Sequence, residues 1–88
     1  MTHHIALFSF RLTGAQSIGP AALRKLWSAA CESDNVRVSR VTQGNGGRMH
    51  TYSLCAPPKT ANLAAIEMRL RRLLDNALPN AAITLISL

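Results

Sequence analysis

Hydrophobic and polar positions divide the chain into six alternating segments. Four short runs rich in branched and aromatic residues, typical of β-strands, lie at 3–12, 36–43, 48–55 and 81–88. The two segments between them that repeat apolar residues every three or four positions are typical of amphipathic helices. The pattern therefore predicts the order strand, helix, strand, strand, helix, strand.

Local signals place the ends of both helices. Pro20 begins the first, because proline at the first helical position gives up no hydrogen bond. Thr60 is the expected N-cap of the second, and Asn76 and Pro79 end it. Glu67 and Arg71 stand four residues apart on its outer side, as do Arg71 and Asp75. The apolar stripes comprise Leu23, Leu26, Trp27 and Ala30 in the first helix, and Leu63, Ile66, Leu70, Leu73 and Ala77 in the second.

This order of elements predicts an α+β protein with the ferredoxin-like βαββαβ fold. Two right-handed strand–helix–strand crossovers folded together give four antiparallel strands in the order 4-1-3-2. Both helices then cover one face of the sheet. A chain of 88 residues has room for one such domain, which we expect to span residues 1–88.

The turn between the second and third strands sets which side chains share a face. Asn45-Gly46 is a strong hairpin signal, because a two-residue type I′ turn needs positive φ at both positions. This turn predicts that Val38 lies opposite Ser53 and that Val41 lies opposite His50. A slip of one residue would exchange the two faces of a strand.

This register predicts a sheet face that no helix covers, with a basic end and an apolar patch. Arg40 is the exception on the other side, since it would face inward from an edge strand and extend around the helix edge. The residues expected on the uncovered face are Ile5, Leu7, Ser9 and Arg11, then Arg37, Ser39, Val41 and Gln43, then Arg48, His50, Tyr52 and Leu54.

Charge narrows the choice of partner. The net charge is +6, with eight Arg and two Lys against four acidic residues. Such a balance permits binding to nucleic acid, to an acidic protein or to an anionic membrane. Abundant Arg and Ala with few Lys are typical of a GC-rich bacterial genome. No apolar run is long enough to span a bilayer and no signal peptide is recognisable, so we expect a cytoplasmic protein.

One stretch resembles the RNA-recognition motif, a family with the same topology. RMHTYSLC (48–55) begins with a basic residue, as the family's third-strand signature does, although its glycine and two of its aromatic residues are missing. The resemblance implies that bases stack on His50 and Tyr52. Together with the basic positions of the uncovered face, it gives the predicted nucleic-acid or partner-binding residues Arg11, Arg37, Arg48, His50 and Tyr52.

A second stretch resembles another family. THHIALFSFR (2–11) is similar to the opening of the stress-responsive dimeric α/β-barrel proteins, in which two ferredoxin-like sheets pack face to face. This resemblance implies a homodimer with a pocket between the sheets, either a ligand binder or a small enzyme. The predicted dimer interface is Ile5, Leu7, Val41 and Leu54.

The sequence patterns that could indicate catalysis or metal binding are incomplete. Gly14 and Gly19 have phosphate-loop spacing, but Pro20-Ala21 replaces the Lys-Ser/Thr that holds phosphate and Mg²⁺. His3 and His4 are adjacent on a strand and point to opposite faces, so they cannot chelate one metal.

The two cysteines, Cys31 and Cys55, are best interpreted as buried thiols. We expect neither a cofactor nor a metal, and we expect no catalytic centre. The sequence instead favours a small binding module that uses the open, basic face of its sheet to bind nucleic acid or an acidic protein.

Overall fold

Four strands and two helices alternate along the chain in the computed structural model, which describes residues 3–13, 17–43, 49–79, 81 and 83–88. Their order confirms the predicted one. The final strand is shorter than the expected 81–88. The elements are β1 (Ile5–Thr13), α1 (Pro20–Cys31), β2 (Arg37–Gln43), β3 (Met49–Ala56), α2 (Leu63–Ala77) and β4 (Thr84–Ser87).

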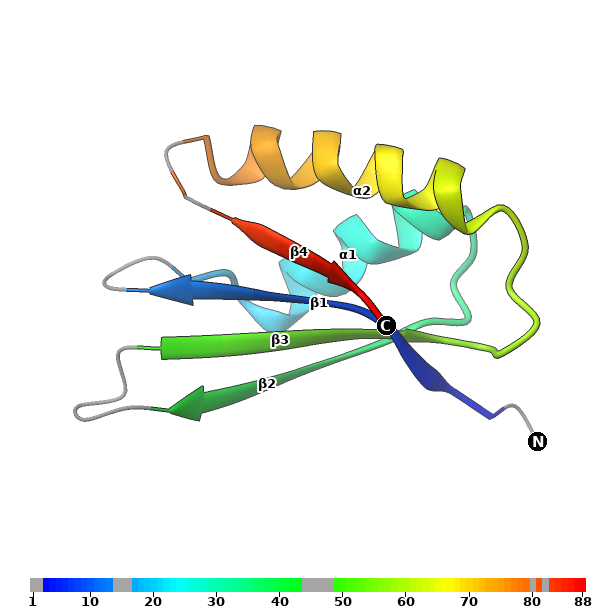
Figure 1. The fold of residues 1–88 in the computed structure, drawn as a ribbon, viewed down its shortest axis with the longest axis horizontal. Coiled ribbons are helices and arrows are strands. Elements are labelled where there is room, and N and C mark those ends of the chain that lie inside the picture. The colour runs from blue at the N-terminus through cyan, green and yellow to red at the C-terminus, as the bar shows by residue number, and fades with distance from the viewer. Residues whose placement is uncertain (1–2, 14–16, 44–48, 80, 82) are drawn as a thin grey trace.

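The strands form one antiparallel sheet in the order β2-β3-β1-β4, which is the predicted 4-1-3-2 order counted from the other edge. Figure 1 shows β2 and β4 at the two edges and β1 and β3 between them. The buried residues of α1 and α2 join those of the sheet in a single core. The fold is α+β and ferredoxin-like, as the pattern predicted.

The register of the β2–β3 hairpin differs from the prediction by one residue. Val38 lies opposite Leu54 and Val41 lies opposite Thr51, where Ser53 and His50 were expected. Because side chains alternate between faces, this shift leaves β2 as predicted and turns β3 over. The proposed turn, Asn45-Gly46, lies outside the described residues.

The helix-covered face of the sheet is strongly apolar and holds every Phe, Tyr and Trp of the chain. Each of these rings is at most 1% exposed. The sheet supplies Phe8, Phe10, Leu12, Tyr52, Leu54 and Ala56, and the helices supply Leu23, Trp27, Ala30, Ile66, Leu70 and Leu74.

Trp27 ties α1 to the sheet. Its side chain is fully buried, and its Nε1–H donates a hydrogen bond of 2.9 Å to the carbonyl oxygen of Cys55. Its ring meets that of Phe8 edge to face, with 5.8 Å between centroids and an interplanar angle of 79°. The indole is therefore both packed and satisfied, as a buried tryptophan requires.

A β-bulge changes the face of one residue predicted to point outward. The β1–β3 register shifts between Ala6 and Phe8, which leaves Leu7 as the extra residue. Leu7 is only 7% exposed and belongs to the core. The prediction that Leu7 lies on the uncovered face was therefore wrong, because strict alternation does not continue through a bulge.

Contacts between the helices fix the end of α1. Arg69 of α2 donates from Nε to the carbonyl oxygen of Ala30 at 2.9 Å, and its Nη2 lies 3.3 Å from Oε1 of Glu32. A cation at a helix C-terminus also stabilises the helix dipole. Arg69 therefore has a structural role.

The start of α2 differs from the prediction. Asn62, in the left-handed conformation with φ of 58°, occupies the N-cap position. Thr60, the predicted cap, donates its hydroxyl to the carbonyl oxygen of Pro57 at 2.6 Å. Its hydroxyl therefore closes a local turn before the helix begins. The predicted pair of Glu67 and Arg71 forms at 3.8 Å.

Candidate binding surface

The sheet face opposite the helices is uncovered, and we call it the open face. Alternation from the observed register places hydroxyl, small and basic side chains there. Its described members are Arg37, Ser39 and Val41 of β2, Met49, Thr51, Ser53 and Cys55 of β3, Ala6, Ser9 and Arg11 of β1, and Thr84 and Ile86 of β4.

Small polar side chains cross the middle of the open face in rows. Ser39, Ser53 and Ser9 are successive cross-strand neighbours, and the next row runs from Thr51 to Arg11. Neighbouring side chains in such rows lie about 5 Å apart. The middle of the open face therefore carries hydroxyl groups and the arginine of β1, and the apolar side chains of Val41 and Ile86 stand at the ends of these rows.

Two predicted binding residues lie on the open face, and two do not. Arg11 and Arg37 are there and exposed, whereas Arg48 lies outside the described residues. Tyr52 is 1% exposed and stacks on Phe10 with 4.8 Å between centroids. His50 is half-buried on the helix side, where its Nδ1 lies 3.1 Å from Oγ1 of Thr42.

The predicted outward orientation of His50 and Tyr52 was therefore wrong. The cause is the hairpin register, which turned all of β3 over. The Tyr52 hydroxyl has a partner inside the protein, since it accepts a hydrogen bond from the N–H of Ile18 at 3.2 Å. A tyrosine held in this way offers no ring for stacking bases.

The four apolar residues of the predicted dimer interface do not come together. Val41 lies on the open face and is 53% exposed. Leu7 and Leu54 are buried in the core, and Ile5 pairs with the buried Ala56. The four predicted residues therefore do not form an apolar patch, although Val41 and Ile86 are exposed on the open face.

Acidic side chains are absent from the strands, whereas basic side chains lie in both layers of the fold. None of the four acidic residues of the chain lies in a strand of the sheet. Among the described residues, Arg11, Arg37 and Arg40 form no ion pair, whereas the helices contain two. The sheet therefore carries positive charge that no acidic side chain of the described chain neutralises.

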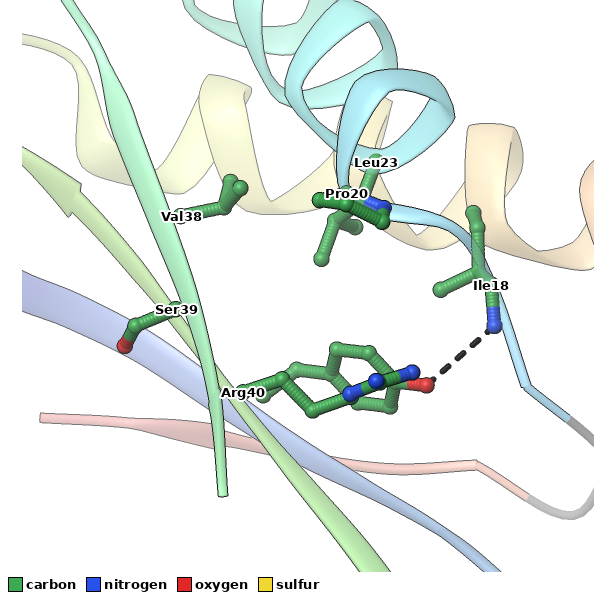
Figure 2. A pocket seen from close by; sticks show the side chains of 7 residues that line it. Ile18, Pro20, Leu23, Val38, Ser39 and Arg40 are labelled. Carbon is green, nitrogen blue, oxygen red and sulfur yellow. Dashed lines mark hydrogen bonds between the residues drawn. The ribbon is translucent and has the colours of Figure 1, made fainter. Parts of the chain in front are cut away.

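A hollow lies beside the open edge of β2, where the sheet extends past α1. Figure 2 shows Val38 and Arg40 pointing toward the start of α1, while Ser39 points away. The hollow has a volume of about 260 Å³ and is lined by Ile18, Pro20, Leu23, Val38, Ser39, Arg40 and Tyr52.

A second, shallower hollow continues the first along β2. It shares Pro20 and Val38 with the first and adds Arg24, Val36 and Arg37. We call the two hollows together the β2 groove. Its floor is apolar, and three arginines border it.

Arg40 is placed as the sequence predicted, facing the helix side from an edge strand. The groove itself was not predicted. The signal was present in that inward arginine, because a charged residue pointing inward at an edge indicates that the helices do not cover that edge.

Neither cysteine is an activated nucleophile. Burial raises the pKa of the Cys31 thiol from 9.0 to about 11, against a smaller opposing effect of Arg69. Burial also raises the pKa of Cys55, opposed by Arg37. Both thiols are therefore protonated at neutral pH, when a nucleophile would need the thiolate.

The described residues contain no group of three His, Cys, Asp or Glu side chains that could hold a metal ion. Within the same ranges, no helix has the length and apolar character needed to cross a bilayer.

Comparison with known proteins gives the fold alone. No protein-family model and no curated protein sequence matches the chain. The chain is similar to the de novo designed protein Foldit4, with 16% identity, a TM-score of 0.51, and coverage of 98% of this chain and 97% of that one.

A second similar structure is a C-terminal segment of the alpha subunit of aIF2 from Pyrococcus abyssi, with 16% identity and a TM-score of 0.44. The match covers 97% of this chain and 51% of that one. At 16% identity the match to Foldit4 shows the fold alone, and function must be argued from the surface of this chain.

Proposed function

We propose that the protein is a non-enzymatic binding module whose open face binds an acidic protein. The observation that carries this proposal is the absence of acidic side chains from the strands, which leaves the arginines of the open face without an acidic neighbour in the sheet. The strands contain Arg11 and Arg37 on an uncovered face, and all the acidic residues lie outside the strands. Complementary potentials of this kind speed encounter and select partners of opposite charge.

The open face suits carboxylates better than bases. Proteins that bind single-stranded nucleic acid combine positive charge with aromatic rings on which bases stack. Here every Phe, Tyr and Trp is in the core. Arginine can bind a carboxylate through two parallel hydrogen bonds, and the surrounding Ser and Thr hydroxyls can donate further ones.

Fluorescence anisotropy with two labelled probes tests the proposal. The probes are polyglutamate and a single-stranded oligonucleotide of the same charge, each measured over a series of salt concentrations. Replacing Arg11 and Arg37 by Gln should weaken polyglutamate binding about tenfold, because each exposed ion pair contributes up to ~1 kcal/mol.

The matched control replaces Lys25 and Arg72 by Gln, which removes the same charge from exposed positions on the two helices. This control should bind polyglutamate within about twofold of the unchanged protein if exposed pairs act locally. Equal weakening by both double variants would show an effect of net charge alone and contradict the proposal. Tighter binding of the oligonucleotide would favour nucleic acid instead.

Light scattering at high salt addresses the dimer predicted from the second resemblance. We expect a monomer, since two of the four residues predicted for that interface, Leu7 and Leu54, are buried in the core. A dimer that persists at high salt and blocks polyglutamate binding would show that a second copy occupies the open face.

A further inference from the structure

The open edge of β2 carries an inference about the form of the acidic partner. We propose that β2 binds an extended acidic segment of the partner as an added strand, with one of its apolar side chains in the β2 groove. This proposal rests on the proposed function, because it takes the partner to be an acidic protein. It adds the place on this protein where the partner binds, the extended conformation of the bound segment, and the pattern of residues in that segment.

The backbone of β2 is suited to accept another strand. It is an edge strand of seven residues, it pairs with β3 without a bulge, and it contains no proline. An edge strand presents alternate N–H and C=O groups that have no partner in the sheet. The opposite edge, β4, has only four residues and offers a shorter template.

The charges of β2 select against a second copy of the chain. Pairing two β2 edges would bring Arg37 and Arg40 of both copies into one strand pair. Like charges on paired strands are destabilising, and basic edge residues commonly prevent such self-association. An acidic strand gains from the same arginines, so charge complementarity decides between the two occupants.

The β2 groove supplies the place for an apolar side chain. Val38 faces the groove, whose floor includes Leu23 and Tyr52, each 1% exposed. The volume of about 260 Å³ exceeds what one apolar side chain needs. Burying such a side chain contributes roughly 1.5–3 kcal/mol when it is fully removed from water.

Alternation along β2 predicts the pattern of the partner. The register places Arg37 and Ser39 on the open face, and Val38 and Arg40 on the groove side. The partner segment should therefore be acidic opposite Arg37, apolar opposite Val38, unrestricted opposite Ser39 and acidic opposite Arg40. The pattern is acidic–apolar–any–acidic for a parallel strand and its reverse for an antiparallel one.

The probes are synthetic peptides as long as β2, with the pattern in each direction and a scrambled version of the same composition. Amide hydrogen exchange, followed by NMR on the full chain, reports the pairing directly. A patterned peptide should protect one alternating set of β2 amides, either 37, 39 and 41 or 38, 40 and 42. The scrambled peptide should bind more weakly and protect neither set.

A charge exchange tests the role of Arg40. Arg40→Glu should weaken binding of the acidic peptide roughly threefold to tenfold, the scale of exposed charge contacts. A peptide with lysine opposite position 40 should restore the affinity for this variant. Arg72→Glu, on the exposed side of α2, makes the same charge change away from β2 and should have little effect.

Three outcomes would overturn the strand-addition proposal. The first is peptide binding without alternate protection of β2, and the second is equal weakening by Arg40→Glu and Arg72→Glu. The third is polyglutamate binding that depends on Arg11 while no patterned peptide binds. Because Arg11 lies only on the open face, this third outcome would leave the proposed function standing.

Discussion

The two faces of the sheet differ in nearly every physical property. The covered face holds all four Phe, Tyr and Trp side chains and has its polar atoms satisfied by internal hydrogen bonds. The open face holds serines, threonines and arginines together with smaller or isolated apolar side chains such as Val41 and Ile86. The difference indicates that the stability of the fold depends mainly on the covered face. Residues of the open face can therefore be suited to a binding partner at little cost in stability.

The same contrast separates the arginines. Arg69 donates a hydrogen bond to the end of α1 and forms an ion pair with Glu32, so its charge is partnered within the protein. Arg11 and Arg37 lie on the open face and form no ion pair with the described residues. A count of basic residues would treat them alike, whereas their surroundings assign them different roles.

The largest expected effect is on the covered face. Trp27→Ala should lower the free energy of unfolding by about 3–5 kcal/mol, through lost packing and the lost hydrogen bond to Cys55. This is a large share of the ~5–15 kcal/mol that stabilises a domain. Urea denaturation followed by circular dichroism measures it. A loss below ~1 kcal/mol would contradict the assignment of stability to this face.

The cysteines provide a chemical comparison between the end of α1, which holds Cys31, and the open face, which holds Cys55. Because the pKa of Cys31 is raised from 9.0 to about 11, its thiolate at pH 8 should be roughly 100-fold scarcer than that of an ordinary thiol. Cys31 should therefore be alkylated more slowly by iodoacetamide than Cys55 of the open face. Mass spectrometry of the Cys31→Ser and Cys55→Ser variants gives the separate rates.

The raised pKa of Cys31 also makes the free energy of unfolding depend on pH in a defined direction. The contribution of the protonated Cys31 thiol is complete below pH 9 and is lost as the pH rises through about 11. Cys31→Ser should therefore flatten the decline of stability over this window. An unchanged pH profile would show that burial of the thiol has no effect on folding.

The smallest expected effect is at the centre of the open face. Ser53 is half-buried and outside the core. Ser53→Ala should change the free energy of unfolding by less than ~0.5 kcal/mol, as substitutions away from the core usually do. Its neighbour Leu54, on the covered face, is the matched control, and Leu54→Ala should cost about 2–5 kcal/mol. A concentration-dependent loss for Ser53→Ala would indicate that another copy covers the open face.

The order of elements was predictable because each segment had one dominant period. The stripe of α1 was correct in Leu23, Trp27 and Ala30, which are all buried. In α2 the buried positions are Ile66, Leu70 and Leu74, so the predicted stripe was wrong at both ends, where Leu63 and Ala77 are exposed. Element type follows from local patterns of this kind, which tertiary contacts here reinforce.

The faces of β3 were not predictable from the turn. Asn45-Gly46 favours a two-residue turn, but the apolar content of the strand favours the observed register. Tyr52 and Leu54 are the large apolar residues of β3, and burying them outweighs the preference of a turn dipeptide. Giving priority to burial would have placed both residues correctly.

The central position of β1 has a consequence for synthesis. Phe8 pairs with Leu54 on one side and with Ser87 on the other, so the first strand made needs partners made much later. Until then, a strand rich in buried apolar residues has two bare edges, a state that favours aggregation. A ribosome that stalled before Thr84 would hold a chain with one edge of β1 still bare. A product that ended before β4 would therefore keep that edge of β1 open to pairing with other chains.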